Sequence, residues 1–290
     1  MKTVVLLLIA ALAAPAATFY LTIAGLGGEP DYVQRFKMWA DDIDGSLKKA
    51  GGDASVVTLN APHLEQIRER FAEFAKQAKP ADAVVVILIG HGTWDGHDYK
   101  FNIPGPDLTA TELGALLDRV PAQRQLVVNM TSCSGGSIEQ LRRTNRIVIA
   151  ATRTGSEKNA TNFARYFAEA LREPAADTDK NESISALEAF RYAQTRTTEF
   201  FDTQKRLASE HSTMEDAGKL AAAFTVVRLG ANAAAARDPG KRPLLDKKEQ
   251  LEQTIEKLKF EKAAMPAQEY RRQLTQLLLE LARTQEALDK

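Results

Sequence analysis

Residues 84–92 read Val-Val-Val-Ile-Leu-Ile-Gly-His-Gly, six aliphatic side chains that run directly into a Gly-His-Gly. A continuous apolar run of this length, closed by glycine, predicts a strand that is buried on both faces of a parallel sheet. His91 would then lie just past the carboxyl end of that strand. This is the edge at which open α/β sheets place their chemistry.

The same construction recurs further along the chain. Residues 126–132 form a second largely apolar run, followed by Cys-Ser-Gly-Gly at 133–136. Cys133 is the only cysteine in the chain. Two neighbouring parallel strands would deliver His91 and Cys133 to the same edge of the sheet. A histidine and a cysteine in this arrangement predict the active site of a thiol protease.

Composition limits the class of protein. The chain has 290 residues, of which 44% are hydrophobic and 26% charged, enough for one α/β domain with an appendage. Lys and Arg together number 38, as do Asp and Glu, so the formal net charge is zero. This balance gives no support for nucleic acid or an anionic membrane surface as a partner. We expect a peptide or protein substrate and no nucleic-acid partner.

The first residues resemble an export signal. Lys2 precedes an apolar stretch at 4–12, and the small residues Ala-Ala-Pro-Ala-Ala at 13–17 resemble a cleavage zone. The alternative is a hydrophobic first strand that merges into residues 19–24. We favour a signal peptide at 1–17 and a periplasmic or secreted protein with no stable membrane span after signal removal. A single cysteine in an exported chain indicates a free thiol.

Strand and helix patterns alternate along the chain. The expected strands cover residues 18–24, 55–59, 84–89, 126–132 and 146–151, with amphipathic helices between them and a last strand at 222–229 on the sheet edge. The alternation predicts a mostly parallel sheet flanked by helices. We therefore expect a domain at 18–229, a linker at 230–243, and a helical hairpin or coiled coil at 244–290. Apolar stripes on these last helices favour self-association.

Residues 177–188 resemble a calcium-binding loop of the EF-hand type. The ligand positions 1, 3, 5, 7, 9 and 12 carry Asp177, Asp179, Asn181, Ser183, Ser185 and Glu188. The sixth position, which favours glycine, carries Glu182, and Pro174 interrupts the entering helix. Two interpretations stay open: a structural Ca²⁺ site, and a polar turn that leads into a helix at 184–195.

The chemistry of a thiol protease assigns roles to three residues. A cysteine attacks a peptide carbonyl as a thiolate, so we expect Cys133 to be the nucleophile, with a low pKa, and His91 to be its proton partner. The backbone amides of Gly92 and Cys133 are the expected donors of an oxyanion hole. His63, His97 and His211 are less suited to the role of His91, because no predicted strand end fixes them. No cofactor is required for this reaction.

These motifs resemble the caspase-fold (caspase-hemoglobinase) cysteine peptidases, and the legumain-like (asparaginyl endopeptidase) branch in particular. The similar elements are Ala24-Gly25, His91-Gly92, Cys133-Ser134-Gly135 with Ser137, Ala150-Ala151-Thr152 and Glu210-His211. The resemblance covers roughly residues 18–229. It implies a caspase-like fold and hydrolysis through a Cys-His dyad and an acyl-thioester, with His91 as acid/base and Cys133 as nucleophile.

The sequence departs from the family before the cysteine. Family members commonly carry Glu or Gln, then Ala, where this chain has Thr131 and Ser132. Asparagine specificity is therefore not carried over. The expected substrate-pocket residues are Arg35, Thr131, Arg153 and Ser156. The altered residues leave two alternatives to a peptidase: a catalytically inactive caspase-fold binding or scaffold module, and a transamidase that uses the same dyad.

Overall fold

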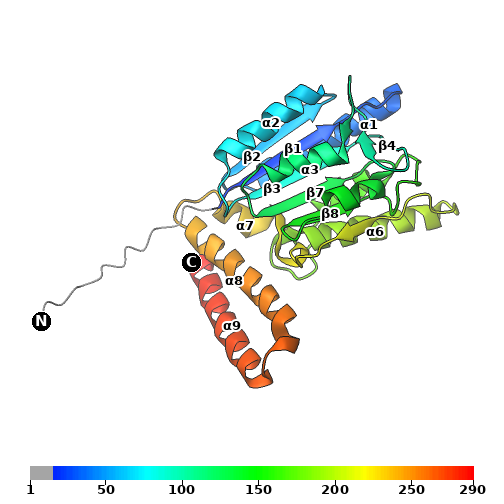
Figure 1. Ribbon diagram of the computed structural model, residues 1–290. Helices are drawn as coiled ribbons and strands as arrows, with labels where there is room; N and C mark the ends of the chain where they lie inside the picture. Colours follow the sequence, from blue (N-terminus) through cyan, green and yellow to red (C-terminus); the bar gives the residue numbers. More distant parts are fainter. Residues whose placement is uncertain (1–15) are drawn as a thin grey trace, which may run out of the picture.

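The computed structural model describes residues 16–290, so most of the expected signal peptide at 1–17 lies outside the described residues. A six-stranded sheet with the order β10-β8-β7-β3-β1-β2 forms the centre of the fold (Figure 1). Its strands are β1 (Thr18–Ala24), β2 (Ala54–Asn60), β3 (Ala83–Ile89), β7 (Arg124–Asn129), β8 (Arg146–Ala150) and β10 (Thr213–Glu215). Five strands run parallel, and β10 pairs antiparallel with β8 at one edge.

Helices cover both faces of this sheet. They are α1 (Pro30–Lys49), α2 (Leu64–Gln77), α3 (Ala110–Asp118), α4 (Ile138–Leu141), α5 (Phe163–Ala170) and α6 (Ala186–Thr203). Alternate side chains of β3 explain the two layers, since Val85 and Ile87 pack with α1, α5 and α6, while Val84 and Val86 pack with α2 and α3. A strand that is buried on both faces needs a continuous apolar run. Every residue of β3 is buried, as the sequence predicts.

Two small sheets lie outside the central one. The strands β4 (Gly92–Trp94), β5 (Tyr99–Phe101) and β6 (Leu108–Thr109) form an antiparallel sheet directly after His91. The strands β9 (Ser183–Ser185) and β11 (Thr225–Arg228) form another. The sequence prediction was wrong here: residues 222–229 do not form the edge of the central sheet, which is closed by β10 instead. β10 spans only three residues, too few for a recognisable alternation.

The carboxyl-terminal segment forms the expected helical hairpin, with α8 (Arg242–Glu261) and α9 (Ala267–Asp289) packed side by side (Figure 1). The predicted linker at 230–243 contains a further helix, α7 (Gly230–Ala235). Asn232 in this helix is buried, and its side-chain amide donates to the carbonyl of Asn181. The segment is therefore packed against the domain rather than free of it. No helix within residues 16–290 has the length and apolar character needed to cross a membrane.

These elements confirm the predicted fold class, a mostly parallel α/β sheet flanked by helices with a carboxyl-terminal helical hairpin. The carboxyl ends of β3 and β7, which pair directly, lead into His91 and Cys133. The opposite edge of the sheet, where β1, β3 and β7 begin, faces α7 and α8 (Figure 1).

Candidate active site

His91 follows β3 and is held by aromatic side chains of α1. Its ring meets Tyr32 and Phe36 edge-on, with ring centroids 4.8 Å and 5.1 Å away. Burial lowers the pKa of His91 below its ordinary 6.5, while a hydrogen bond to the backbone of Gly27 opposes this. The imidazole is therefore neutral at neutral pH. The nitrogen that donates to Gly27 fixes the tautomer, so the other nitrogen is left as a proton acceptor.

Cys133 follows β7 in an unusual backbone conformation. Its φ of 59° and ψ of 7° lie in the left-handed region, which costs a non-glycine residue about 1–2 kcal/mol. Such strain beyond a strand end is a feature of functional sites. The side chain is only 2% exposed, and it joins the apolar cluster on the α2 and α3 side of the sheet. The thiol is thus free, as a single cysteine predicts, and buried.

The protonation state of the thiol differs from the expectation as well. Burial raises the pKa of Cys133 above its ordinary value of 9.0, and the nearby charge of Lys158 lowers it only in part. The predicted low pKa of this thiol is therefore wrong for this conformation. The cause is the desolvation of the thiolate, which an apolar environment disfavours.

The two strand ends meet directly. In the register of β3 and β7, Leu88 lies opposite Asn129, and the amide of Met130 donates to the carbonyl of Leu88 at 2.9 Å. Beyond the carboxyl ends of the two strands, Gly92 and Ser132 contact each other through the serine hydroxyl. The residue after His91 is therefore bonded to the residue before Cys133. Among the described residues, no hydrogen bond joins the His91 ring to the Cys133 thiol.

Both expected oxyanion donors already have acceptors. The amide of Gly92 donates to Ser132 Oγ at 3.0 Å, and the amide of Cys133 donates to the carbonyl of Glu157 at 2.8 Å. An oxyanion hole needs donors that point at the developing charge. In this conformation the predicted two-donor hole is therefore not assembled, because protein groups occupy both amides.

Residues 153–158, here called the covering loop, hold the amide of Cys133. The carboxylate of Glu157 in this loop accepts hydrogen bonds from the Arg153 amide and from the amide of His211, each at 3.0 Å. The ring nitrogen Nδ1 of His211 lies 2.8 Å from the same carboxylate. The covering loop is thereby tied to the loop that carries His211.

The covering loop is also closely packed against the residues that surround Cys133. A Cβ atom on Gly155 would lie 2.3 Å from the Trp94 ring, and one on Gly135 would lie 2.3 Å from the backbone of Arg153. Only glycine permits these contacts. The glycines beyond Cys133 therefore serve the packing of the covering loop in this conformation.

The four expected pocket residues differ in burial and in their contacts. Thr131 is fully buried, and its hydroxyl is bonded to Tyr99 at 2.6 Å and to Asn129 at 2.8 Å. In this conformation the side chain points into the molecule and is not accessible to a substrate, so Thr131 as a pocket residue stays a prediction. Arg35 is exposed, and its guanidinium carbon lies 5.7 Å from the centroid of the Tyr32 ring. The Tyr32 ring in turn contacts the ring of His91. Arg153 and Ser156 are exposed on the covering loop.

The calcium-like loop folds in a manner that partly fits the cation. Carboxylate oxygens of Asp177, Asp179 and Glu188 lie within 4.8 Å of one another. Glu182, at the position that favours glycine, has a positive φ of 63°. However, both oxygens of Glu188 accept protein hydrogen bonds, from Thr178 and from Ser185. The donor set suits Ca²⁺, while the interpretation as a turn that caps α6 accounts for the same bonds.

Sequence reasoning missed two residues that matter here. Ser132 was recognised as a departure from the family pattern, but not as the partner of the Gly92 amide. Glu157 carries no motif, and its role depends on two loops that are 54 residues apart, Glu157 and His211. Only the folded chain brings these together.

No protein-family model matches the chain, and no curated protein matches it. Among solved structures, it is similar to the Drosophila initiator caspase Dronc, with a TM-score of 0.49, 8% identity, and coverage of 70% of this chain and 80% of that one. Caspase-1 from Spodoptera frugiperda gives a TM-score of 0.49 and 13% identity, with 70% and 86% covered.

A third structure is the protein GSU0716 from Geobacter sulfurreducens, with a TM-score of 0.49, 12% identity, and 74% and 98% covered. All three TM-scores are below 0.5, so these similarities carry no argument about the chain. Its fold class is that of a mostly parallel sheet, flanked by helices, whose edge strand β10 is antiparallel. What the chain does therefore rests on its own residues.

Proposed function

We propose that the protein is an exported cysteine endopeptidase of the legumain-like type. The observation that supports this most is the meeting of two strand ends, which brings His91 and Cys133 to one edge of the sheet with the cysteine in a left-handed conformation. A histidine held by aromatic rings at one strand end, and a strained cysteine at the end of the neighbouring strand, are two groups with a chemical use. The residue preferred before the scissile bond stays open, because Thr131 is buried.

The proposed reaction starts from the conformation described above, in which the covering loop holds the Cys133 amide. Displacement of the covering loop frees the amide of Cys133, and rotation of the Ser132 hydroxyl frees the amide of Gly92. Because the thiol and the imidazole are both neutral at neutral pH, His91 acts as a general base that removes the Cys133 proton as the sulfur attacks.

The remaining steps follow from this attack. The carbonyl oxygen of the scissile bond becomes an oxyanion, which the two freed amides bind. His91 then returns the proton to the leaving amine, and an acyl-thioester on Cys133 remains. His91 removes a proton from a water molecule as it attacks the thioester, the C–S bond breaks to release the carboxylic acid product, and His91 returns the proton to the Cys133 sulfur. A transamidase differs only in the last step, where an amine replaces water.

A second candidate is a caspase-fold module without proteolysis, which binds a partner. Two observations favour it: Cys133 is only 2% exposed, and both expected oxyanion donors are occupied. The helical hairpin α8–α9 would then present the domain to another protein or to a second copy of this chain.

One experiment separates the two candidates. The protein is treated with an electrophilic peptide probe and with a peptide library, beside the variants Cys133→Ala and His91→Ala. A peptidase labels at Cys133 and cleaves the library, and each variant loses turnover. If no peptide is cleaved and labelling is unchanged in both variants, the protein is not a cysteine peptidase. An added amine that becomes joined to the acyl product would identify the transamidase, and fractionation of cells would test the periplasmic location.

A further inference from the structure

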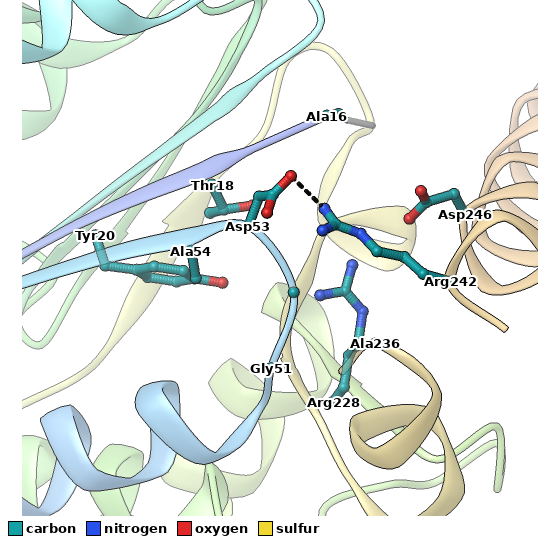
Figure 2. A pocket seen from close by; sticks show the side chains of 11 residues that line it. Ala16, Thr18, Tyr20, Gly51, Asp53, Ala54, Arg228, Ala236, Arg242 and Asp246 are labelled. Atoms are coloured by element: carbon teal, nitrogen blue, oxygen red, sulfur yellow. Dashed lines mark ion pairs between the residues drawn. The ribbon is translucent and has the colours of Figure 1, made fainter. Parts of the chain in front are cut away.

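A second cavity lies at the edge of the sheet opposite His91 and Cys133. It has a volume of about 1040 Å³, and it is bounded by the amino ends of β1, β3 and β7 on one side and by α8 on the other. A smaller pocket adjoins it and shares Arg228, Arg242 and Asp246 as lining residues. Figure 2 shows these side chains, with Arg228 and Arg242 reaching toward the strand ends.

The walls of this cavity carry an excess of positive charge. Among residues 16–290, five cationic and two acidic side chains line it: Arg124, Arg228, Arg237, Arg242 and Lys247, against Asp246 and Glu249. A concave site lined in this way attracts anions and excludes cations. The edge of the sheet used by the proposed peptidase site contributes none of these residues.

Three of the five cations already have carboxylate partners. Arg228 forms a bidentate ion pair with Glu249, in which its two guanidinium nitrogens lie 2.6 Å and 2.8 Å from the carboxylate oxygens. Arg242 pairs with Asp53 at 2.8 Å, the contact drawn as a dashed line in Figure 2. Lys247 pairs with Glu280 at 2.8 Å. These pairs attach α8 to the sheet and to α9, which is a structural role.

Arg124 and Arg237 have no such partner. Among residues 16–290, the Arg124 guanidinium forms no ion pair and no hydrogen bond. Within the same described range, Arg237 donates only to the backbone carbonyls of Ala233 and Lys49. The remaining carboxylate, Asp246, lies beside Arg242 in Figure 2 and forms no ion pair among the described residues.

The environment of Arg124 is unfavourable without a ligand. Burial lowers the pKa of Arg124 below its ordinary value, the negative charge of Glu249 opposes this, and the positive charge of Arg228 makes a smaller contribution in the lowering direction. A half-buried guanidinium without a partner is costly, and an anion in the cavity would compensate for it.

We propose that this cavity binds a small phosphate-bearing anion, with Arg124 and Arg237 as its principal ligands. Guanidinium groups offer planar, paired donors that match phosphate oxygens, and several of them from different elements suit a group with more than one charge. The volume accommodates a phosphorylated small molecule rather than a bare ion. Its binding would bridge the amino edge of the sheet and the start of α8.

The test uses the full chain with inorganic pyrophosphate as the probe, followed by calorimetry and by thermal unfolding. Pyrophosphate should bind and raise the unfolding temperature. Arg124→Gln should weaken binding by about tenfold or more, as expected for a lost charge-assisted hydrogen bond. Arg271→Gln, on the exposed face of α9, is the matched control and should bind as the parent does.

A second readout separates a ligand-binding arginine from a structural one. Because burial disfavours the charge of Arg124, which has no ion-pair partner among residues 16–290, Arg124→Gln should raise the unfolding temperature of the ligand-free protein while it weakens binding. If this variant does not fold, the exposed Arg237→Gln replaces it in the binding experiment. The proposal is overturned if millimolar pyrophosphate does not bind, if Arg271→Gln weakens binding equally, or if citrate binds as tightly as pyrophosphate.

Discussion

The hydroxyl of Ser132 satisfies both backbone groups of Gly92, accepting a hydrogen bond from its amide and donating one to its carbonyl, each at 3.0 Å. This single side chain therefore occupies a donor that an oxyanion hole would use. Alanine, which the peptidases that the sequence resembles commonly carry at this position, lacks that hydroxyl. The difference between the two residues suggests a direct experiment.

Ser132→Ala should increase kcat/KM on peptide substrates, because it frees the Gly92 amide for the oxyanion. In other enzymes, removal of one oxyanion-hole donor lowers kcat by about 10²–10³-fold. The variant should also lose about 1–3 kcal/mol of stability, because the Gly92 carbonyl loses a partner. Thr131→Val is the matched control, since it removes a buried hydroxyl next in sequence that does not touch Gly92. A rise in both variants would contradict the prediction.

Alkylation of Cys133 by iodoacetamide should be slow at neutral pH and should accelerate as the pH rises through 9.0, the ordinary pKa of a thiol. Burial raises this pKa, and only the thiolate reacts. Lys158→Gln should move the profile to higher pH, because it removes the charge that lowers the pKa. Mass spectrometry follows the adduct, and Lys205→Gln serves as a control on an exposed loop. A rate that levels off below pH 8 would show a thiolate already present.

The acid limb of the peptidase activity should lie below pH 6.5, the ordinary pKa of histidine, because burial lowers the pKa of His91. As the pH falls through this lowered pKa, His91 takes up a proton and no longer acts as a base. Tyr32→Ala should expose the ring to water and move the acid limb back toward higher pH. The pH dependence of kcat/KM measures this, with Tyr270→Ala on α9 as a control that should not move it.

Release of the covering loop should expose the thiol. Glu157→Ala removes the carboxylate that holds Arg153 and His211, and the loss of these contacts should raise the alkylation rate of Cys133 by about tenfold. The backbone carbonyl that binds the Cys133 amide is kept in this variant, so the effect measures the side chain alone. Glu139→Ala, in an exposed ion pair, is the control. An unchanged rate would mean that the loop does not limit access.

Calcium should raise the unfolding temperature at millimolar concentration, and a chelator should reverse the effect. Burial raises the pKa of Asp179, and the charges of Glu188 and Asp177 raise it further, so a bound cation would relieve their repulsion. Asp179→Asn should abolish the calcium effect, whereas Asp41→Asn on the surface of α1 should keep it. If calcium leaves the parent unchanged, the loop is a turn that caps α6.

The sequence predicted the central strands because β3 and β7 are buried on both faces, and burial of that kind leaves a continuous apolar run. The edge strand β10 and the helix α7 escaped prediction for the opposite reason, since three residues and a run of alanines carry little periodicity. His91 and Cys133 were identifiable because each follows such a strand. The hydrogen bonds around these two residues could not be predicted from the sequence. The Gly92 amide donates to Ser132 and the Cys133 amide donates to Glu157, and only the folded chain brings these partners together.

The left-handed backbone of Cys133 has a consequence for how this position tolerates change. Glycine adopts that conformation without strain, so Cys133→Gly should fold at least as well as Cys133→Ala, although neither has a thiol.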